Sequence, residues 1–188
     1  MTRAAWPNRG LALRDQRSRS GFTIMELLLI VVIMAIIATT AVPMISQASD
    51  ARQAAARDEV VRLFEFARGR AMASGMPVGV EIDTASSSLR LVTINTAGGI
   101  VELADSIGGG TMGSSLTNEF SGVTIDSFVN GDGASGDGTV WFDFLATPHL
   151  RNDVSGAFDE VFSRVSTLTL STGGLVIVHA DSGFVEAQ

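Results

Sequence analysis

A long apolar stretch from Phe22 to Val42 constrains the fold of this chain more than any other feature. At about 1.5 Å rise per residue, roughly twenty such residues in a helix cover a bilayer core of about 30 Å. The stretch contains a single charged side chain, Glu26. A carboxylate inside a membrane segment is costly, so its presence indicates a functional role and a partner of opposite charge.

The charges on either side of this stretch differ in sign. Five arginines and a single acid, Asp15, precede it, and the chain that follows is acidic, which places the N-terminus in the cytoplasm. A secretory signal peptide would have a shorter apolar core and a small-x-small cleavage site, which Ala38 and Ala41 supply poorly. A plain anchor helix explains the length but not Glu26. The residues alone leave these interpretations open beside a more specialised one.

The segment Gly21-Phe22-Thr23-x-x-Glu26-Leu27 resembles the type III signal of prepilins and pseudopilins. The resemblance implies that prepilin peptidase cleaves between Gly21 and Phe22, that Phe22 becomes N-methylated, and that Glu26 stays in the membrane to act in assembly. There the carboxylate can pair with the α-amino group of a neighbouring subunit. Glycine has no side chain, so the scissile bond can lie extended in a peptidase cleft. Pro43 lies where this family carries a helix-kinking proline.

The expected organisation has four parts. Residues 1–21 are a basic leader, 22–44 the transmembrane part of a long helix, 45–75 its amphipathic periplasmic part, and 76–188 a β domain. In the second part, apolar residues recur at three- and four-residue spacing and predict a face packed on a sheet. These residues are Ala48, Ala51, Ala55, Val60, Leu63, Phe64, Ala67 and Ala71.

Local signals refine the helix and its end. Glu65 and Arg68 are three residues apart and predict a surface ion pair. Ser74 and Gly75, followed by Pro77, predict the end of the helix.

After Gly75 the sequence consists of short β-branched or aromatic runs separated by glycine, serine, asparagine and aspartate. The runs are Val78–Ile82, Leu89–Ile94, Val123–Phe128, Val140–Phe144, Val165–Leu170 and Leu175–His179. Ser171–Gly174 predicts a hairpin turn between the last two. The fold class is therefore α+β, with a long N-terminal helix followed by an antiparallel β-sheet or sandwich.

The junction between helix and first strand, from Ala67-Arg68 to Pro77-Val78, resembles the GspH/FimT family. This resemblance implies a pilin-like fold and a minor pseudopilin of a type II secretion system, at or near the tip of a periplasmic pseudopilus. It implies a single-pass inner-membrane protein with its globular domain in the periplasm. The implied partners are other pseudopilins, major and minor, prepilin peptidase and the inner-membrane platform. The alternative is a FimT-like type IV minor pilin that acts in pilus assembly or DNA uptake.

Composition argues against binding to nucleic acid. The formal charge is −7, and loss of the leader with its five arginines and one aspartate would change it to −11. The chain has no lysine, and no arginine follows Arg164. Phosphate backbones are bound by clusters of lysine and arginine, so we expect no nucleic-acid partner. The absence of cysteine excludes disulfides and thiolate metal sites.

Neither the glycine pattern at 108–113 nor the histidines of the chain give much support to a cofactor site or an active site. Gly108-x-Gly110-x-x-Gly113 matches the dinucleotide fingerprint but lacks the flanking βαβ unit that the fingerprint requires. Only two histidines, His149 and His179, occur, and there is no Gly-x-Ser-x-Gly elbow, so we expect no enzyme and no resident cofactor.

A weak calcium candidate remains in the loop with Asn130, Asp132 and Asp137, whose spacing begins like a calcium loop. Ala134 occupies the third ligand position, and a solvated loop is the favoured interpretation. Calcium stays open because related pseudopilins include calcium binders.

Overall fold

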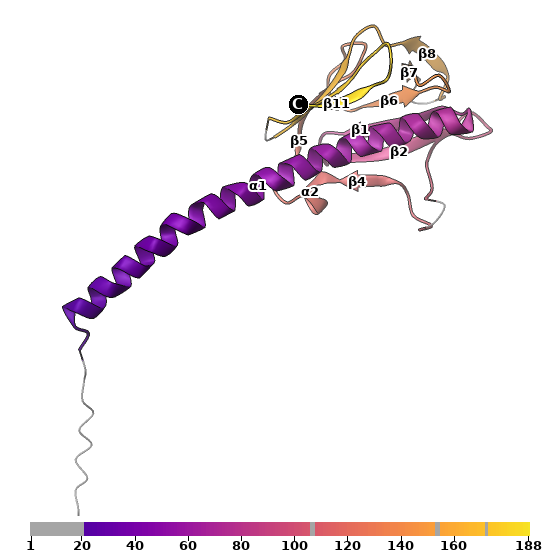
Figure 1. The fold of residues 1–188 in the computed structure, drawn as a ribbon. Helices are drawn as coiled ribbons and strands as arrows, with labels where there is room; N and C mark the ends of the chain where they lie inside the picture. Colours follow the sequence, from indigo (N-terminus) through magenta and orange to yellow (C-terminus); the bar gives the residue numbers. More distant parts are fainter. Residues whose placement is uncertain (1–20, 106–107, 153–154, 172) are drawn as a thin grey trace, which may run out of the picture. The chain divides into compact units, whose positions relative to one another are not determined.

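The computed structural model describes residues 21–105, 108–152, 155–171 and 173–188, with the side chains of 40–46 excepted. Contacts divide the chain into two compact units, with the boundary between Met44 and Ile45. Helix α1, Ile24–Ser74, contributes residues to both units, and the strands belong to the second (Figure 1).

The second unit contains two antiparallel sheets. The larger has the strand order β3-β2-β1-β6-β7-β8, with β4 also paired to β2, and the smaller has the order β11-β10-β9-β5. A short helix α2, Leu116–Glu119, follows β4. The strands are β1 Val78–Asp83, β2 Ser88–Ile94, β3 Ile100–Glu102, β4 Gly113–Ser115, β5 Ile125–Val129, β6 Gly138–Phe142, β7 Pro148–Arg151, β8 Phe158–Val161, β9 Ser166–Leu170, β10 Leu175–Val178 and β11 Val185–Ala187.

One hydrophobic core joins the helix to both sheets. The helical residues in it recur every three or four positions, as one face of an α-helix requires. They are Ala56, Val60, Leu63, Phe64, Ala67 and Ala71. The Phe64 ring meets the Phe142 ring of β6 edge to face, with centroids 6.5 Å apart. Val80 of β1, Leu168 of β9 and Val176 of β10 belong to the same cluster, so this helix face holds the two sheets together.

The expected end of the helix is confirmed. Helix α1 ends at Ser74, and Gly75 follows with a φ of 69°, in the left-handed region that glycine adopts at low cost. The N–H of Gly75 donates to the carbonyl of Ala71 at 3.0 Å, and the N–H of Met76 donates to Oγ of Ser74 at 3.2 Å. These bonds complete the last turn before β1 begins at Val78.

The predicted apolar face is wrong at its start. Ala48, Ala51 and Ala55 are exposed, and the buried face begins at Ala56 instead. Ala55 lies one position, about 100° of helical rotation, from Ala56 and therefore points away from the core. Alanine is a good helix former at exposed and buried positions alike, so its presence does not mark the buried face.

The strand predictions hold for six strands, with one clear shift. The run expected at Val140–Phe144 is the strand Gly138–Phe142, because Asp143 begins a turn. Its Oδ1 accepts the N–H groups of Leu145 and Thr147 at 2.9 and 2.8 Å, which ends the strand and exposes Phe144. The predicted hairpin between β9 and β10 is confirmed by their antiparallel register, although residue 172 lies outside the described residues.

The role of the helix in the core gives a direct test on two neighbouring phenylalanines. Phe64→Ala removes a ring that is 1% exposed, and we expect it to lower the free energy of unfolding by about 3–5 kcal/mol. Phe66→Ala removes a ring that is 37% exposed on the same helix, and we expect a change of less than about 1.5 kcal/mol. Urea denaturation of the full chain measures both. Equal losses would contradict the assignment of the buried face.

Candidate functional site

The predicted processing segment lies at the described start of the first unit. Gly21, Phe22 and Thr23 are outside any helix or strand, and the side chain of Phe22 is 71% exposed. A Cβ added to Gly21 would have no atom of this chain within 4 Å. Contacts with the described residues therefore do not require glycine at position 21.

Thr23 caps helix α1, a feature that the sequence analysis missed. Its Oγ1 accepts the N–H of Glu26 at 3.2 Å, and its carbonyl accepts the N–H of Leu27 at 3.1 Å. Thr23-x-x-Glu26 is the capping-box pattern, and this signal could have been found in the sequence. Glu26 thus occupies the first helical turn, where a carboxylate is stabilised by the positive end of the helix dipole. Glu26 has a local structural role whatever further role it has in assembly.

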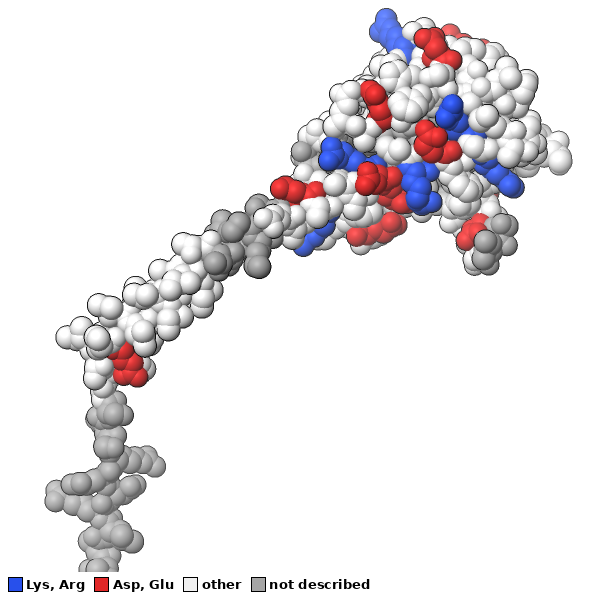
Figure 2. All heavy atoms as spheres, in the orientation of Figure 1, with Lys and Arg blue, Asp and Glu red and all other residues white. Residues whose placement is uncertain are grey.

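The surface of this first helical segment is apolar. Glu26 is the only charged residue among the described residues 21–39, and the corresponding rod in Figure 2 is white apart from a single red group. The exposed apolar side chains are Ile24, Met25, Leu27, Leu28, Leu29, Ile30, Val31, Val32, Ile33, Met34, Ile36 and Ile37. In the part of the chain that the structure describes, no helix has both the length and the hydropathy needed to span a bilayer. Helix α1 continues through Pro43, where a kink is predicted, and the side chains of residues 40–46 lie outside the described part of the chain.

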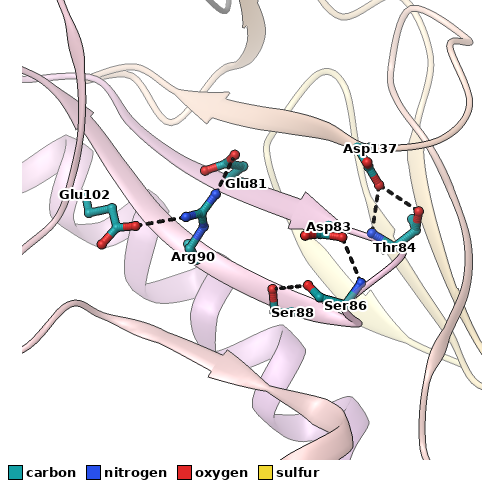
Figure 3. A network of polar contacts seen from close by, with 8 residues as sticks. All are labelled: Glu81, Asp83, Thr84, Ser86, Ser88, Arg90, Glu102 and Asp137. Carbon is teal, nitrogen blue, oxygen red and sulfur yellow. Dashed lines mark hydrogen bonds and ion pairs between the residues drawn. The ribbon is translucent and has the colours of Figure 1, made fainter.

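A second polar site lies on the face of the large sheet that points away from the helix. Arg90 of β2 donates to Glu81 of β1 and to Glu102 of β3, both at 2.9 Å (Figure 3). Beside this ladder, Oδ1 of Asp137 accepts the N–H and the hydroxyl of Thr84 at 2.8 and 2.7 Å. The pairs join three adjacent strands across their exposed face and link the loop before β6 to the turn after β1.

The calcium candidates make local hydrogen bonds in this structure. Oδ1 of Asn130 accepts the N–H of Gly131, and Oδ1 of Asp132 accepts the N–H of Ala134. Asp137 bonds Thr84 instead, as described above. Within the described ranges, no group of three or more histidine and acidic side chains is placed to hold a metal ion. The calcium interpretation stays a prediction with no geometric support.

The glycines of the fingerprint-like segment lie in a hairpin. Strand β3 continues through an isolated bridge between Ala104 and Thr111, and Asp105 donates its N–H to the carbonyl of Gly110 at 2.7 Å. Gly113 then begins β4, where a Cβ would lie 2.5 Å from the carbonyl oxygen of Leu89. The requirement for glycine at position 113 is thus a close approach of two strands.

The two histidines have different environments. His179 is partly exposed, with Nε2 3.5 Å from Oε1 of Glu186. His149 is 1% exposed, its Nδ1 lies 3.1 Å from the carbonyl of Thr147, and its Nε2 accepts the Nε–H of Arg151 at 2.9 Å. Burial, together with the positive charge of Arg151, lowers the pKa of His149 below its ordinary 6.5. His149 is therefore a neutral structural acceptor for Arg151.

Comparison with known proteins finds similarity in structure but none in sequence families. No family model matches the chain, and no curated protein matches it. The structure is similar to the minor pseudopilin EpsH from the type 2 secretion system of Vibrio cholerae, with a TM-score of 0.52 and 13% identity over 72% of this chain and 94% of that chain. The fold is pilin-like.

A second crystal structure of EpsH gives a TM-score of 0.50, 14% identity and coverage of 76% of this chain and 93% of that chain. The type IV minor pilin FimU of Pseudomonas aeruginosa matches at a TM-score of 0.44, with 11% identity over 71% of this chain and 90% of that chain. The expected α+β fold, a long N-terminal helix packed on antiparallel sheets, is confirmed. At these identities the likeness extends to the fold and no further.

The buried histidine generates a pH test. The unfolded chain binds a proton at His149 more readily than the folded chain, because burial lowers the pKa of His149 in the fold. We expect its contribution to stability to be complete above pH 6.5 and to be lost as the pH falls below 6.5, with a slope of at most about 1.4 kcal/mol per pH unit. Thermal unfolding of the full chain between pH 5 and 7 measures this slope.

The matched control is His149→Gln, whose amide can accept from Arg151 and donate to Thr147 without titrating. In this variant, stability should fall less steeply as the pH decreases from 7 to 5, because the contribution of His149 to the pH dependence is absent. An identical slope in both proteins would contradict a buried, neutral His149.

Proposed function

We propose that this chain is a minor pseudopilin, a structural subunit of the periplasmic pseudopilus of a type II protein secretion system, at or near its tip. The observation that carries the proposal is the type III signal pattern Gly21-Phe22-Thr23-x-x-Glu26-Leu27 directly before an apolar helix, in a chain with a pilin-like fold. The role is mechanical, in protein transport, and not enzymatic.

Processing by prepilin peptidase is the first step of the proposed pathway. The peptidase cleaves after Gly21 on the cytoplasmic side and Phe22 is methylated, so the mature chain keeps its apolar helix. Residues 22–44 then cross the inner membrane once, and residues 45–188 lie in the periplasm. The exposure of Phe22 and the open space around Gly21 support access of a peptidase to this bond.

Assembly follows by packing of apolar helices against those of major and minor pseudopilins and by contact with the inner-membrane platform. At least twelve large apolar side chains between Ile24 and Ile37 are exposed in the described part of the first unit. A surface of this kind favours helix–helix association. Glu26 would pair with the α-amino group of Phe22 in a neighbouring subunit and set the axial register.

Two variants of Glu26 separate the assembly role from the capping role. Glu26→Gln keeps a side chain suited to the third position of a capping box but removes the charge, and Glu26→Val removes both. If the ammonium–carboxylate pair sets the register, we expect both variants to be processed normally and both to fail to enter filaments. Immunoblots of sheared filament fractions against membrane fractions measure incorporation.

The outcomes of this pair are distinct. Failure of Glu26→Val alone would assign the residue to helix capping. Normal incorporation of both variants would contradict any assembly role for the carboxylate.

The alternative function is that of a type IV minor pilin in pilus assembly or DNA uptake. The charge balance favours secretion, because residues 45–188 contain eight arginines against eighteen acidic residues. Of these arginines, Arg62, Arg68 and Arg90 are paired with carboxylates. DNA binding would need several free cations in a cluster.

A gel-shift titration of the full chain tests this choice. We expect no binding of duplex DNA at physiological salt below about 10⁻⁴ M, the weak limit of typical non-specific binders. The matched variant Glu81→Gln, which frees one side of Arg90, should not create binding. Micromolar binding that weakens steeply with salt would contradict the secretion assignment and favour DNA uptake.

A further inference from the structure

The large sheet has a small buried cluster on the face opposite to the helix. Val140 and Phe142 of β6 point into the main core, so Trp141 between them points to the other face. Trp141 is fully buried there and is the register partner of His149 in β7. Arg151 lies two residues further along β7, on the same face as His149, and its guanidinium lies 5.9 Å from the centre of the Trp141 ring.

Arg151 is a half-buried cation that has no ion pair with any of the described residues. Its Nε–H donates to Nε2 of His149 at 2.9 Å, and Nη1 donates to the carbonyl of Gly156 at 2.7 Å. A guanidinium has five N–H groups, so three of them have no partner among the described residues. No carboxylate of the described residues lies within 4.0 Å, whereas Arg62, Arg68 and Arg90 each have such a partner.

Asp143 does not form an ion pair with this cation. Asp143 lines the same hollow and attracts the charge of Arg151 through space. Its Oδ1, however, accepts the N–H groups of Leu145 and Thr147, which hold the carboxylate in the turn after β6. Burial lowers the pKa of Arg151, a sign that the fold stabilises this charge less well than water does.

A hollow of about 270 Å³ opens beside Arg151. Gly75 and Pro77 from the helix–strand junction line it, together with the rings of Phe144 and Phe158. These rings are 60% and 57% exposed, and Leu145 next to Phe144 is 68% exposed. The hollow thus combines one cation that has unused donors with apolar walls that face solvent.

The hollow also lies at a sheet edge. Strand β8, which carries Phe158, ends the strand order and pairs only with β7 among the described strands. All four of its residues are exposed. An open edge of this kind can accept an extended segment through backbone hydrogen bonds.

We propose that this hollow binds an extended segment of a partner protein that places a carboxylate on Arg151 and an adjacent apolar side chain between Phe144 and Phe158. A carboxylate fits because the unused donors belong to a planar guanidinium, which binds it in a bidentate manner. A small free ligand fits less well, because the volume is below the lower limit of about 300 Å³ for such sites and the exposed apolar side chain of Leu145 follows Phe144. The inference is independent of the proposed function, since it concerns a different surface from the N-terminal helix.

A random heptapeptide library displayed on phage, panned against the full chain in lipid nanodiscs, provides the test. Empty nanodiscs remove unspecific phage. We expect the selected peptides to contain aspartate or glutamate next to an aromatic or branched apolar residue. The best peptide is then titrated against a Trp6→Phe chain, in which Trp141 is the only remaining fluorophore of its type.

Three variants define the result of the titration. Arg151→Gln should weaken binding about tenfold or more, the usual effect of removing a charge-assisted hydrogen bond. Because Arg151 also bonds Gly156, Phe158→Ser provides a second probe at an exposed ring, and it should weaken binding several-fold with little change in Tm. Arg164→Gln, an exposed arginine that does not line the hollow, should bind as the parent does.

Two results would overturn the proposal. One is a selected pool without enrichment of acidic residues, an empty pool included. The other is a peptide that binds the Arg151→Gln or the Phe158→Ser chain as tightly as the parent chain.

Discussion

Burial of one helix face between two sheets is the interaction on which the rest of this structure depends. The buried side chains from Ala56 to Ala71 contact strands of both sheets, and without them neither sheet would have a partner for its apolar face. The Phe64–Phe142 contact lies in this layer. Full burial of a large apolar side chain contributes about 1.5–3 kcal/mol, so the three large side chains of this face, Val60, Leu63 and Phe64, supply a substantial part of the stability of a domain this small. The apolar side chains near the start of α1 are instead exposed in the described part of their own unit, which is why a role in association with other helices suits them.

The sequence predicted the elements whose apolar residues follow a regular pattern. The buried face from Val60 onward follows three- and four-residue spacing, and six strands follow from β-branched runs between turn residues. It did not predict β3, β4, β7, β8 or β11, which are three or four residues long. Strand β8 is exposed on both faces, so it has no apolar alternation to detect. The error at Ala48, Ala51 and Ala55 has a similar origin, because alanine carries no information about the face it occupies.

The candidate sites differ in whether they can be detected from the sequence alone. The segment Gly21–Leu27 is contiguous, so its pattern is visible in the sequence, although the capping role of Thr23 was overlooked. The hollow at Arg151 unites the end of α1, the turn after β6 and the edge strand β8. Its parts are separated by up to 83 positions, from Gly75 to Phe158, and only strand pairing brings them together. The need for glycine at position 79 is likewise invisible in the sequence. It arises because the Trp141 indole packs over Gly79, where an added Cβ would lie 2.8 Å from the ring.

We propose that this pilin-like chain keeps its apolar N-terminal helix after processing and uses it as an anchor and an assembly surface. Intact-mass spectrometry of the chain purified from membranes is the decisive measurement. We expect a mature protein that begins at Phe22 with one added methyl group. A mature N-terminus beyond Pro43, the product of an ordinary secretory signal peptide, would contradict it.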